Sequence, residues 1–195
     1  MRTRNSRLLI KKLRKLAKDP SIDLWAIDEV HFQQHGSRGL MWIPPEVKDP
    51  VLLHHPTRKS VGYFGAVRLR DGKFMAIQES KQFDAQTTWA FYHQLRRVSC
   101  RSGRRVVVIV DNARFHHARM HREWREAQEP DFQLLFLPPY SPDLNPIERI
   151  WKLVRRLCLH NRYFPKLELV AETVECQFAQ WRIASPTLVK LCKVA

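Results

Sequence analysis

This sequence lacks the features that define several common protein classes. It contains no apolar run approaching the ~18 residues of a membrane-spanning helix, and no signal-peptide pattern opens it. Its four cysteines are widely spaced and form no C-x-x-C pair, so neither a disulfide framework nor a zinc knuckle is indicated. A G-x-G-x-x-G loop, an internal repeat and a low-complexity tract are also missing. We therefore expect a soluble, cytoplasmic protein with reduced cysteines.

Acidic residues are scarce relative to basic ones. The chain has 34 Lys and Arg against 19 Asp and Glu, which gives a formal net charge of +15. Such an excess predicts a polyanionic partner, and nucleic acid is a better candidate than an anionic membrane surface because no spanning run is present. At 195 residues and 44% hydrophobic content, the chain is long enough for one well-buried core and short for two.

The expected elements indicate a mixed α/β sheet. Apolar, β-prone stretches predict five strands at residues 24–32, 61–69, 73–78, 106–110 and 132–137. Periodic stretches predict helices at 84–98, 116–128, 146–160 and 167–181, and a basic amphipathic helix at 7–18. Asp71-Gly72 predicts a tight hairpin between the second and third strands. Antiparallel strands followed by strands joined through helices give a mixed five-stranded sheet flanked by helices.

A proline-rich loop is expected between the first two strands. Residues 44–59 contain too many prolines for regular structure. The loop carries a basic group made of His54, His55, Arg58 and Lys59.

The most informative strand is Val106–Val110. Its five β-branched residues have no polar interruption, which predicts a central strand buried on both faces. It ends at Asp111, and in open α/β sheets ligands collect at the carboxyl ends of central strands. The alternative is that Asp111 or Asn112 only turns the chain and caps the following helix.

Two other acids are candidates for the same point. Asp28 lies in the middle of the first strand, and alternation sends its neighbour Glu29 to the opposite face. Glu148 lies three residues after Asn145, at the start of a predicted helix. That spacing is also the spacing of a capping box, so capping alone would explain it. If the first and fourth strands are neighbours, Asp28, Asp111 and Glu148 converge.

Three converging carboxylates define a specific chemistry. They repel one another unless cations neutralise them, and oxygen ligands select Mg²⁺ or Mn²⁺. Carboxylates arranged in this way are expected to form a phosphoryl-transfer site with two metal ions. One ion would lower the pKa of an attacking water or sugar hydroxyl, and the other would stabilise the leaving oxygen.

At these residues the sequence resembles a known family. The matching blocks are Asp28-Glu29, Asp111–His116 (DNARFH) and Pro138–Glu148 (PPYSPDLNPIE). They are similar to the three blocks of DDE transposases of the mariner superfamily, in particular its bacterial branch, insertion sequence six-thirty. Thirty-six residues lie between Asp111 and Glu148, close to the short spacing of that family. The resemblance extends from about Leu24 to the C-terminus.

The resemblance implies an RNase H-like fold with strand order 3-2-1-4-5 and an antiparallel second strand. It implies cleavage of double-stranded DNA at transposon ends and strand transfer into target DNA, at TA dinucleotides. Asp28, Asp111 and Glu148 would be the catalytic residues and metal ligands. The catalytic domain would cover residues 21–195, with residues 1–20 as a basic helix or linker.

The resemblance also assigns supporting residues and partners. His116 matches the Asp-Asn block and, with Asn112 and Asn145, would support the site. Family members carry an N-terminal helix-turn-helix region that binds the terminal repeats. Only about twenty residues precede the first strand here, so the chain resembles the catalytic half of such a protein, and a helix-turn-helix segment is a candidate partner. The alternatives are a second reading frame joined by frameshifting, a truncated relic and a cloned domain. We expect a homodimer in the DNA complex, associated with the bacterial nucleoid.

Two further groups of side chains have competing interpretations. A basic cluster follows Glu148 and would grip DNA phosphates, although a solvated helical face explains it equally simply; its members are Lys152, Arg155, Arg156 and Arg162. His117 and His121 stand four residues apart on a predicted helix, where a solvated face is the simpler interpretation than a metal site. The alternative functions are an inactive DNA-binding relic and a stand-alone RNase H-like nuclease.

Overall fold

The computed structural model describes residues 4–37, 40, 42–48, 51, 53, 56–79, 82–129, 131–139 and 141–194, with side chains from Arg7 onward. Its centre is a five-stranded sheet of order β3-β2-β1-β4-β5. The strands are β1 (Ile22–Gln33), β2 (Ser60–Arg68), β3 (Phe74–Glu79), β4 (Arg105–Val110) and β5 (Phe132–Phe136). Strand β2 is antiparallel to β1 and β3, whereas β4 is parallel to β1 and β5. The strand order expected from the resemblance is confirmed.

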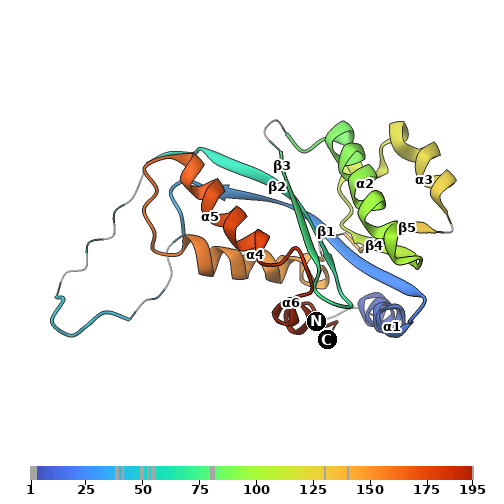
Figure 1. Cartoon of the computed structure of the whole chain (residues 1–195), viewed down its shortest axis with the longest axis horizontal. Coiled ribbons are helices and arrows are strands. Elements are labelled where there is room, and N and C mark those ends of the chain that lie inside the picture. The colour runs from blue at the N-terminus through green and yellow to red at the C-terminus, as the bar shows by residue number, and fades with distance from the viewer. Residues whose placement is uncertain are drawn as a thin grey trace.

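Helices cover both faces of the sheet (Figure 1). One face carries α2 (Ala85–Ser99) and α3 (Arg122–Gln128). The other carries α1 (Arg4–Lys18), α4 (Glu148–Val154), α5 (Leu167–Ala179) and α6 (Pro186–Leu191). Each layer encloses its own hydrophobic cluster, and β4 contributes to both: Val107 and Ile109 to one, Val108 and Val110 to the other. Burial of β4 on both faces is confirmed.

Local sequence signals set several element ends. Asp84 caps α2, because its Oδ1 accepts from the backbone amides of Gln86 and Thr87 at 2.9 Å each. The turn between β2 and β3 contains Gly72 at a φ of +71°, a left-handed conformation that glycine adopts without a steric penalty. These findings confirm the predicted start of α2 and the predicted hairpin.

The helix predicted over residues 116–128 is wrong in its first half. Two 3₁₀ turns, η2 (Arg114–His117) and η3 (Arg119–His121), precede α3. Between them Ala118 adopts an extended ψ of 140°, which breaks the helical hydrogen-bond pattern. Two histidines explain the break: His116 is buried against α2, and the ring of His121 is hydrogen-bonded to the carbonyl of Phe115 at 2.8 Å.

The start of α4 also differs from expectation. Its N-cap is Ile147 without a side-chain cap, so Asn145 is not the capping residue. The Asn145 amide instead donates to the carbonyl of Ile27 at 2.8 Å. After Val154 the helix widens into a π turn, Arg155–Leu159. A short helix that the periodicity did not predict, α6, begins where the Ser185 hydroxyl accepts from the amide of Leu188.

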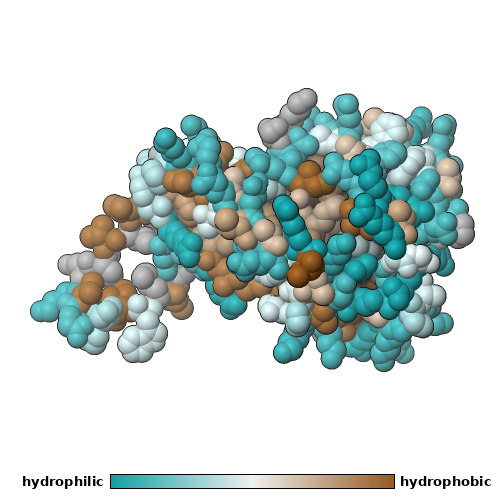
Figure 2. Space-filling model, viewed as in Figure 1, coloured by the Kyte–Doolittle hydropathy of each residue, from teal (hydrophilic) through white to brown (hydrophobic). Residues whose placement is uncertain are grey.

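The segment between β1 and β2 extends away from the sheet (Figure 1). It exposes large apolar side chains, including Leu40, Trp42 and Val51, which are at least 86% exposed. Figure 2 shows brown, hydrophobic side chains on this projection. His54 and His55 of the predicted loop and Tyr140 of the third sequence block lie outside the described residues.

None of the helices in the described part of the chain is long and apolar enough to cross a membrane.

Candidate active site

A cavity of about 400 Å³ opens at the carboxyl end of β4, and three acids line it. Asp28 comes from β1, Asp111 directly follows β4, and Glu148 is the first residue of α4. The remaining walls are formed by Asn112, Ala113, Leu137, Pro138, Pro139, Ser141, Pro142 and Asn145. The structure therefore brings together the three acids that the sequence analysis selected.

The pairing of β1 with β4 explains why two of these acids meet. The last pair in the parallel register joins Ala26 to Ile109. Asp28 and Asp111 each lie two residues further along, so they are level with each other at the end of the shared ladder. Ala26 and Ile109 also belong to the same hydrophobic cluster, on the face covered by α4. Alternation therefore places Asp28 toward Glu148.

Asp28 is the most perturbed of the three carboxyl groups. Its Oδ2 accepts a hydrogen bond from Trp151 Nε1 at 3.0 Å. Burial, followed by the nearby charge of Glu148, raises the pKa of Asp28 to about 7. Trp151 lies three residues after Glu148 on α4, so one face of this helix supplies both the hydrogen-bond donor and the negative charge next to Asp28.

Asp111 is held in its ionised form. Its Oδ1 accepts from the amide of Ala113 at 3.0 Å and lies 3.3 Å from Nε2 of His116. The hydrogen bond from His116 is the main reason that the pKa of Asp111 lies below its usual value. Burial lowers the pKa of His116, so its ring is neutral, with the Nε2 proton facing the carboxylate. The Tyr92 hydroxyl then donates to Nδ1 at 2.7 Å.

Glu29 lies on the opposite face of β1, as alternation predicts. Its Oε1 is 3.7 Å from Nε2 of His116, and the residue does not line the cavity. Burial, then the charges of Asp28 and Asp111, raise the pKa of Glu29 well above its usual value. Burial therefore disfavours the charged form of Glu29, and its side chain is not part of the cavity lining.

Two supporting residues join separate segments around the cavity. Asn145 links the loop before α4 to the Ile27 carbonyl, next to Asp28. Asn112 lines the cavity, and its Oδ1 accepts from Nε2 of His117 at 2.6 Å. With His116, these contacts place the side chains that flank the three acids.

The charge and the donor atoms of the three acids determine whether the cavity suits a divalent cation. No Lys or Arg among the described residues forms a salt bridge with Asp28, Asp111 or Glu148, so their charges are not neutralised by protein cations. Oxygen is the only donor type that the three offer, as Mg²⁺ and Mn²⁺ prefer. Within the described ranges no three acidic, His or Cys side chains already form a closed ligand set.

The predicted DNA-binding cluster lies away from the cavity wall. Lys152, Arg156 and Arg162 are exposed. Arg155 is half-buried, with its guanidinium 5.6 Å from the centre of the Phe32 ring. His117 and His121 do not form a metal pair, because His117 stacks on Phe136 whereas His121 is buried and bound to a backbone carbonyl.

Sequence analysis missed two residues of the site. Trp151 is buried in the core, and its indole N–H also donates to Asp28. Its position three residues after Glu148 was the available signal. Tyr92 lies within the helix predicted at residues 84–98, and no local pattern links it to His116, which lies 24 residues later.

Comparisons with known proteins agree with this geometry. The family model described as DDE superfamily endonuclease matches residues 23–170. The uncharacterized protein y4pE/y4sA of Sinorhizobium fredii is 34% identical over 102 residues, covering 52% of this chain and 70% of the relative. The insertion element IS630 uncharacterized 39 kDa protein of Shigella sonnei is 27% identical over 99 residues, covering 50% of this chain and 27% of that protein.

Solved structures show the same fold. The Mos1 transposase paired-end complex with the left transposon end superposes with a TM-score of 0.70 at 18% identity, over 95% of this chain and 55% of the Mos1 chain. The Mos1 paired-end complex with Mn has a TM-score of 0.69 at 18% identity, over 95% of this chain and 55% of the Mos1 chain. The paired-end complex with Mg has a TM-score of 0.63 at 20% identity, over 96% of this chain and 57% of the Mos1 chain. The sheet order and its flanking helices are therefore those of the RNase H-like fold. This chain spans only about half the length of these Mos1 chains.

The chain belongs to the DDE superfamily endonucleases. Its sequence is similar to that of the IS630 protein, and its fold is similar to that of Mos1 transposase.

Proposed function

We propose that this chain is the catalytic domain of a DDE transposase that cleaves DNA at transposon ends and joins the freed 3′ hydroxyl to target DNA. The observation that carries the proposal is the meeting of Asp28, Asp111 and Glu148 in one cavity. They come from three separate elements, so the fold, and not local capping, brings them together. Residues 21–195 would form the catalytic domain, with residues 1–20 as a basic helix or linker.

Asp28, Asp111 and Glu148 would hold two Mg²⁺ or Mn²⁺ ions. Support comes from the oxygen-only donor set and from the raised pKa of Asp28, which reflects negative charge in a partly dry site. When bound, such ions supply Lewis-acid chemistry that activates a water or sugar hydroxyl and stabilises the leaving oxygen. Mos1 complexes with Mn and Mg are structural neighbours of this chain.

The other residues of the cavity would orient the reaction. His116, fixed by Tyr92, donates to Asp111 and keeps this carboxylate ionised and aimed at the cavity. Trp151 fixes one oxygen of Asp28, which leaves Oδ1 for a ligand. Asn145 holds the loop of Glu148 against β1. Such preorganisation matters because phosphoryl transfer depends mainly on positioning and electrostatic stabilisation.

Double-stranded DNA is the proposed partner. The net charge of +15 supports phosphate binding, with Lys152, Arg155, Arg156 and Arg162 as candidate contacts. A helix-turn-helix segment upstream of this chain would supply recognition of the terminal repeats, and the target would be TA dinucleotides. The protein would act on the bacterial nucleoid in the cytoplasm.

A homodimer in the DNA complex is part of the proposal. Its support is the projecting segment between β1 and β2, which exposes Leu40, Trp42 and Val51. Apolar side chains gathered on an exposed projection are typical of protein interaction surfaces.

The test is metal-dependent cleavage of duplex DNA that carries the ends of the transposon. The wild-type chain, joined to a helix-turn-helix segment that binds these ends, should nick the DNA with Mg²⁺ or Mn²⁺ and form strand-transfer products. Asp111→Asn and Glu148→Gln should each lower the rate by at least about 10³-fold, the scale of losing a main electrostatic contribution. Asp143→Asn is the matched control, because Asp143 is exposed, lies in the same loop and does not line the cavity.

The outcomes separate the alternatives. Nicking without strand transfer would indicate an RNase H-like nuclease. DNA binding without metal-dependent nicking would indicate an inactive relic and would contradict the proposal.

A further inference from the structure

A stacked pair of rings lies at the rim of the acidic cavity. His117 of η2 stacks on Phe136, the last residue of β5, with ring centroids 4.2 Å apart and an interplanar angle of 17°. Nε2 of His117 donates to Oδ1 of Asn112 at 2.6 Å, and Asn112 lines the cavity. The ring pair is therefore joined to the cavity through one side chain.

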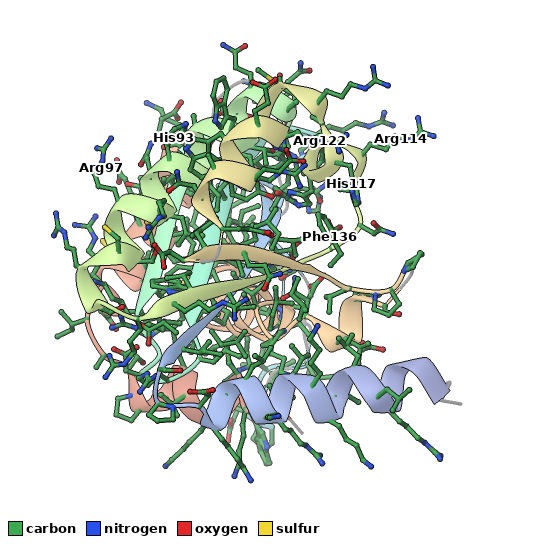
Figure 3. All side chains as sticks on the ribbon, turned by 90° about the vertical axis from the view of Figure 1, so that its right-hand side faces the viewer. His93, Arg97, Arg114, His117, Arg122 and Phe136 are labelled. Atoms are coloured by element: carbon green, nitrogen blue, oxygen red, sulfur yellow. The ribbon has the colours of Figure 1, made fainter. Side chains whose placement is uncertain are left out.

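His117 is the exposed ring of the pair. Phe136 is half-buried behind His117, and His117 is exposed. Arg114 is three residues before His117 in the same 3₁₀ turn, where side chains at i and i+3 eclipse one another. The exposed Arg114 side chain therefore lies on the same face, and Figure 3 shows Arg114, His117 and Phe136 following one another along one side of the molecule.

A solvated histidine does not account for this arrangement. The ring is fixed at its edge by Asn112 and on its face by Phe136, so an exposed side chain gives up rotamer freedom. His93 provides a contrast on the other side of the view in Figure 3. It is also exposed, but its ring is tilted by 43° against Trp124 and does not adjoin the cavity.

A fixed aromatic face beside a cation matches the chemistry of an unpaired nucleotide. Proteins bind single-stranded nucleic acid by stacking bases on aromatic or histidine rings, while arginine contacts the backbone or stacks in turn. A paired base within a duplex cannot offer its face in this way.

We propose that Arg114, His117 and Phe136 form a base-stacking platform that holds one unpaired nucleotide beside the cavity. The proposal rests on the proposed function and deepens it, because it names the state of the substrate: the strand is locally unpaired next to the phosphate that reacts. Stacking on His117 replaces stacking lost from the duplex. The Arg114 guanidinium binds the adjacent phosphate.

The test compares binding of two DNA substrates in metal-free buffer, where no cleavage occurs. One is a fully paired duplex, and the other has the same sequence with one unpaired 2-aminopurine, placed as a bulge or as a 3′ overhang. The wild-type chain should bind the unpaired substrate about 5- to 100-fold more tightly and quench its fluorescence, as expected for one stacked base.

Three variants identify the ring responsible. His117→Ala should abolish both the preference and the quenching while leaving affinity for paired duplex within about twofold. His117→Phe should keep both, since stacking needs a ring and not an imidazole. His93→Ala, an exposed histidine away from the cavity, should behave as wild type.

Three results would overturn the platform: equal affinity of the wild type for both substrates, loss of the preference in His117→Phe, or an equal loss in His93→Ala. Because this assay needs no metal, it is independent of the cleavage test. A chain that shows the preference but never nicks DNA would contradict the proposed function and support the platform. A chain that nicks DNA without the preference would contradict the platform alone.

Discussion

Gly65 of β2 lies directly opposite Asp28 of β1 in the antiparallel register, and a Cβ at Gly65 would lie 2.2 Å from Cη2 of Trp151. The missing side chain is therefore what allows the Trp151 indole to reach Asp28. The contact between α4 and β1 depends on this close approach, because the indole both packs in the core and donates to the carboxyl group.

Gly65→Ala should displace Trp151 and weaken the fold. Overpacking of this kind costs about 1–3 kcal/mol, which urea unfolding would measure. In a Trp151→Leu background the same substitution should cost less, since the clashing ring atoms are gone. Equal costs in the two backgrounds would show that Trp151 does not determine the need for glycine.

Asp28→Asn should change the pH dependence of stability in the absence of metal. The pKa of Asp28 is raised to about 7 in the folded chain from 3.8, so the folded state binds the extra proton. Stability from this group is therefore fully present below about pH 4 and is lost as the pH rises through 7. At pH 8 the variant should be more stable than wild type by about 2–4 kcal/mol. At pH 5 this advantage should be much smaller. Urea unfolding in EDTA at both pH values measures this, and a difference that is the same at both would contradict it.

Asp23 should be among the most costly acids to remove for stability. It is fully buried and paired with Arg68 at 3.2 Å and Arg70 at 2.9 Å, and Arg70 also donates to the carbonyl of Ile22. Asp23→Ala leaves two guanidinium groups without their buried partner, so a loss of about 3–5 kcal/mol is expected. The control is Glu126→Ala on α3, which removes an exposed ion pair with Arg122 and should cost under about 1 kcal/mol. Similar losses in the two variants would contradict the account.

The strand segments and the three candidate acids could be predicted because their signals are local, whereas the strand order came from the family resemblance. The uninterrupted β-branched run of β4 predicts burial on both faces, and alternation separates Asp28 from Glu29. The break at Ala118 was not predictable, because it depends on the packing of His116 against α2, which is distant in sequence. The capping interpretation of Asn145 failed for the same reason. Its spacing to Glu148 fits a capping box, but its amide binds Ile27, 118 residues earlier.

DNA binding by this chain should depend on salt more than on sequence. With roughly five phosphate contacts and a log–log slope of about −0.9 per contact, a fourfold salt increase should weaken binding several hundred-fold. Helix α1 carries exposed cations at helical spacing: Arg7, Lys11, Arg14 and Lys18.

Lys11→Gln with Arg14→Gln should reduce that slope by about 1.8. The control is the double variant Arg97→Gln with Arg101→Gln. It removes the same amount of charge from exposed positions that do not line the cavity, and it should change the slope less. Fluorescence anisotropy across a salt series checks this. Strong preference of this chain alone for one terminal-repeat sequence over scrambled duplex would contradict phosphate-dominated binding.

The most direct test of the central claim is Mn²⁺ binding measured by thermal unfolding at pH 8. If Asp28, Asp111 and Glu148 hold the metal together, Mn²⁺ at about 100 times its Kd should raise the Tm of the wild type by roughly 5–10 °C. Asp28→Asn, Asp111→Asn and Glu148→Gln should each remove most of this shift, while Asp143→Asn should retain it. A shift that survives substitution of any one of the three acids, or that is absent from the wild type, would contradict the assignment of a shared metal site.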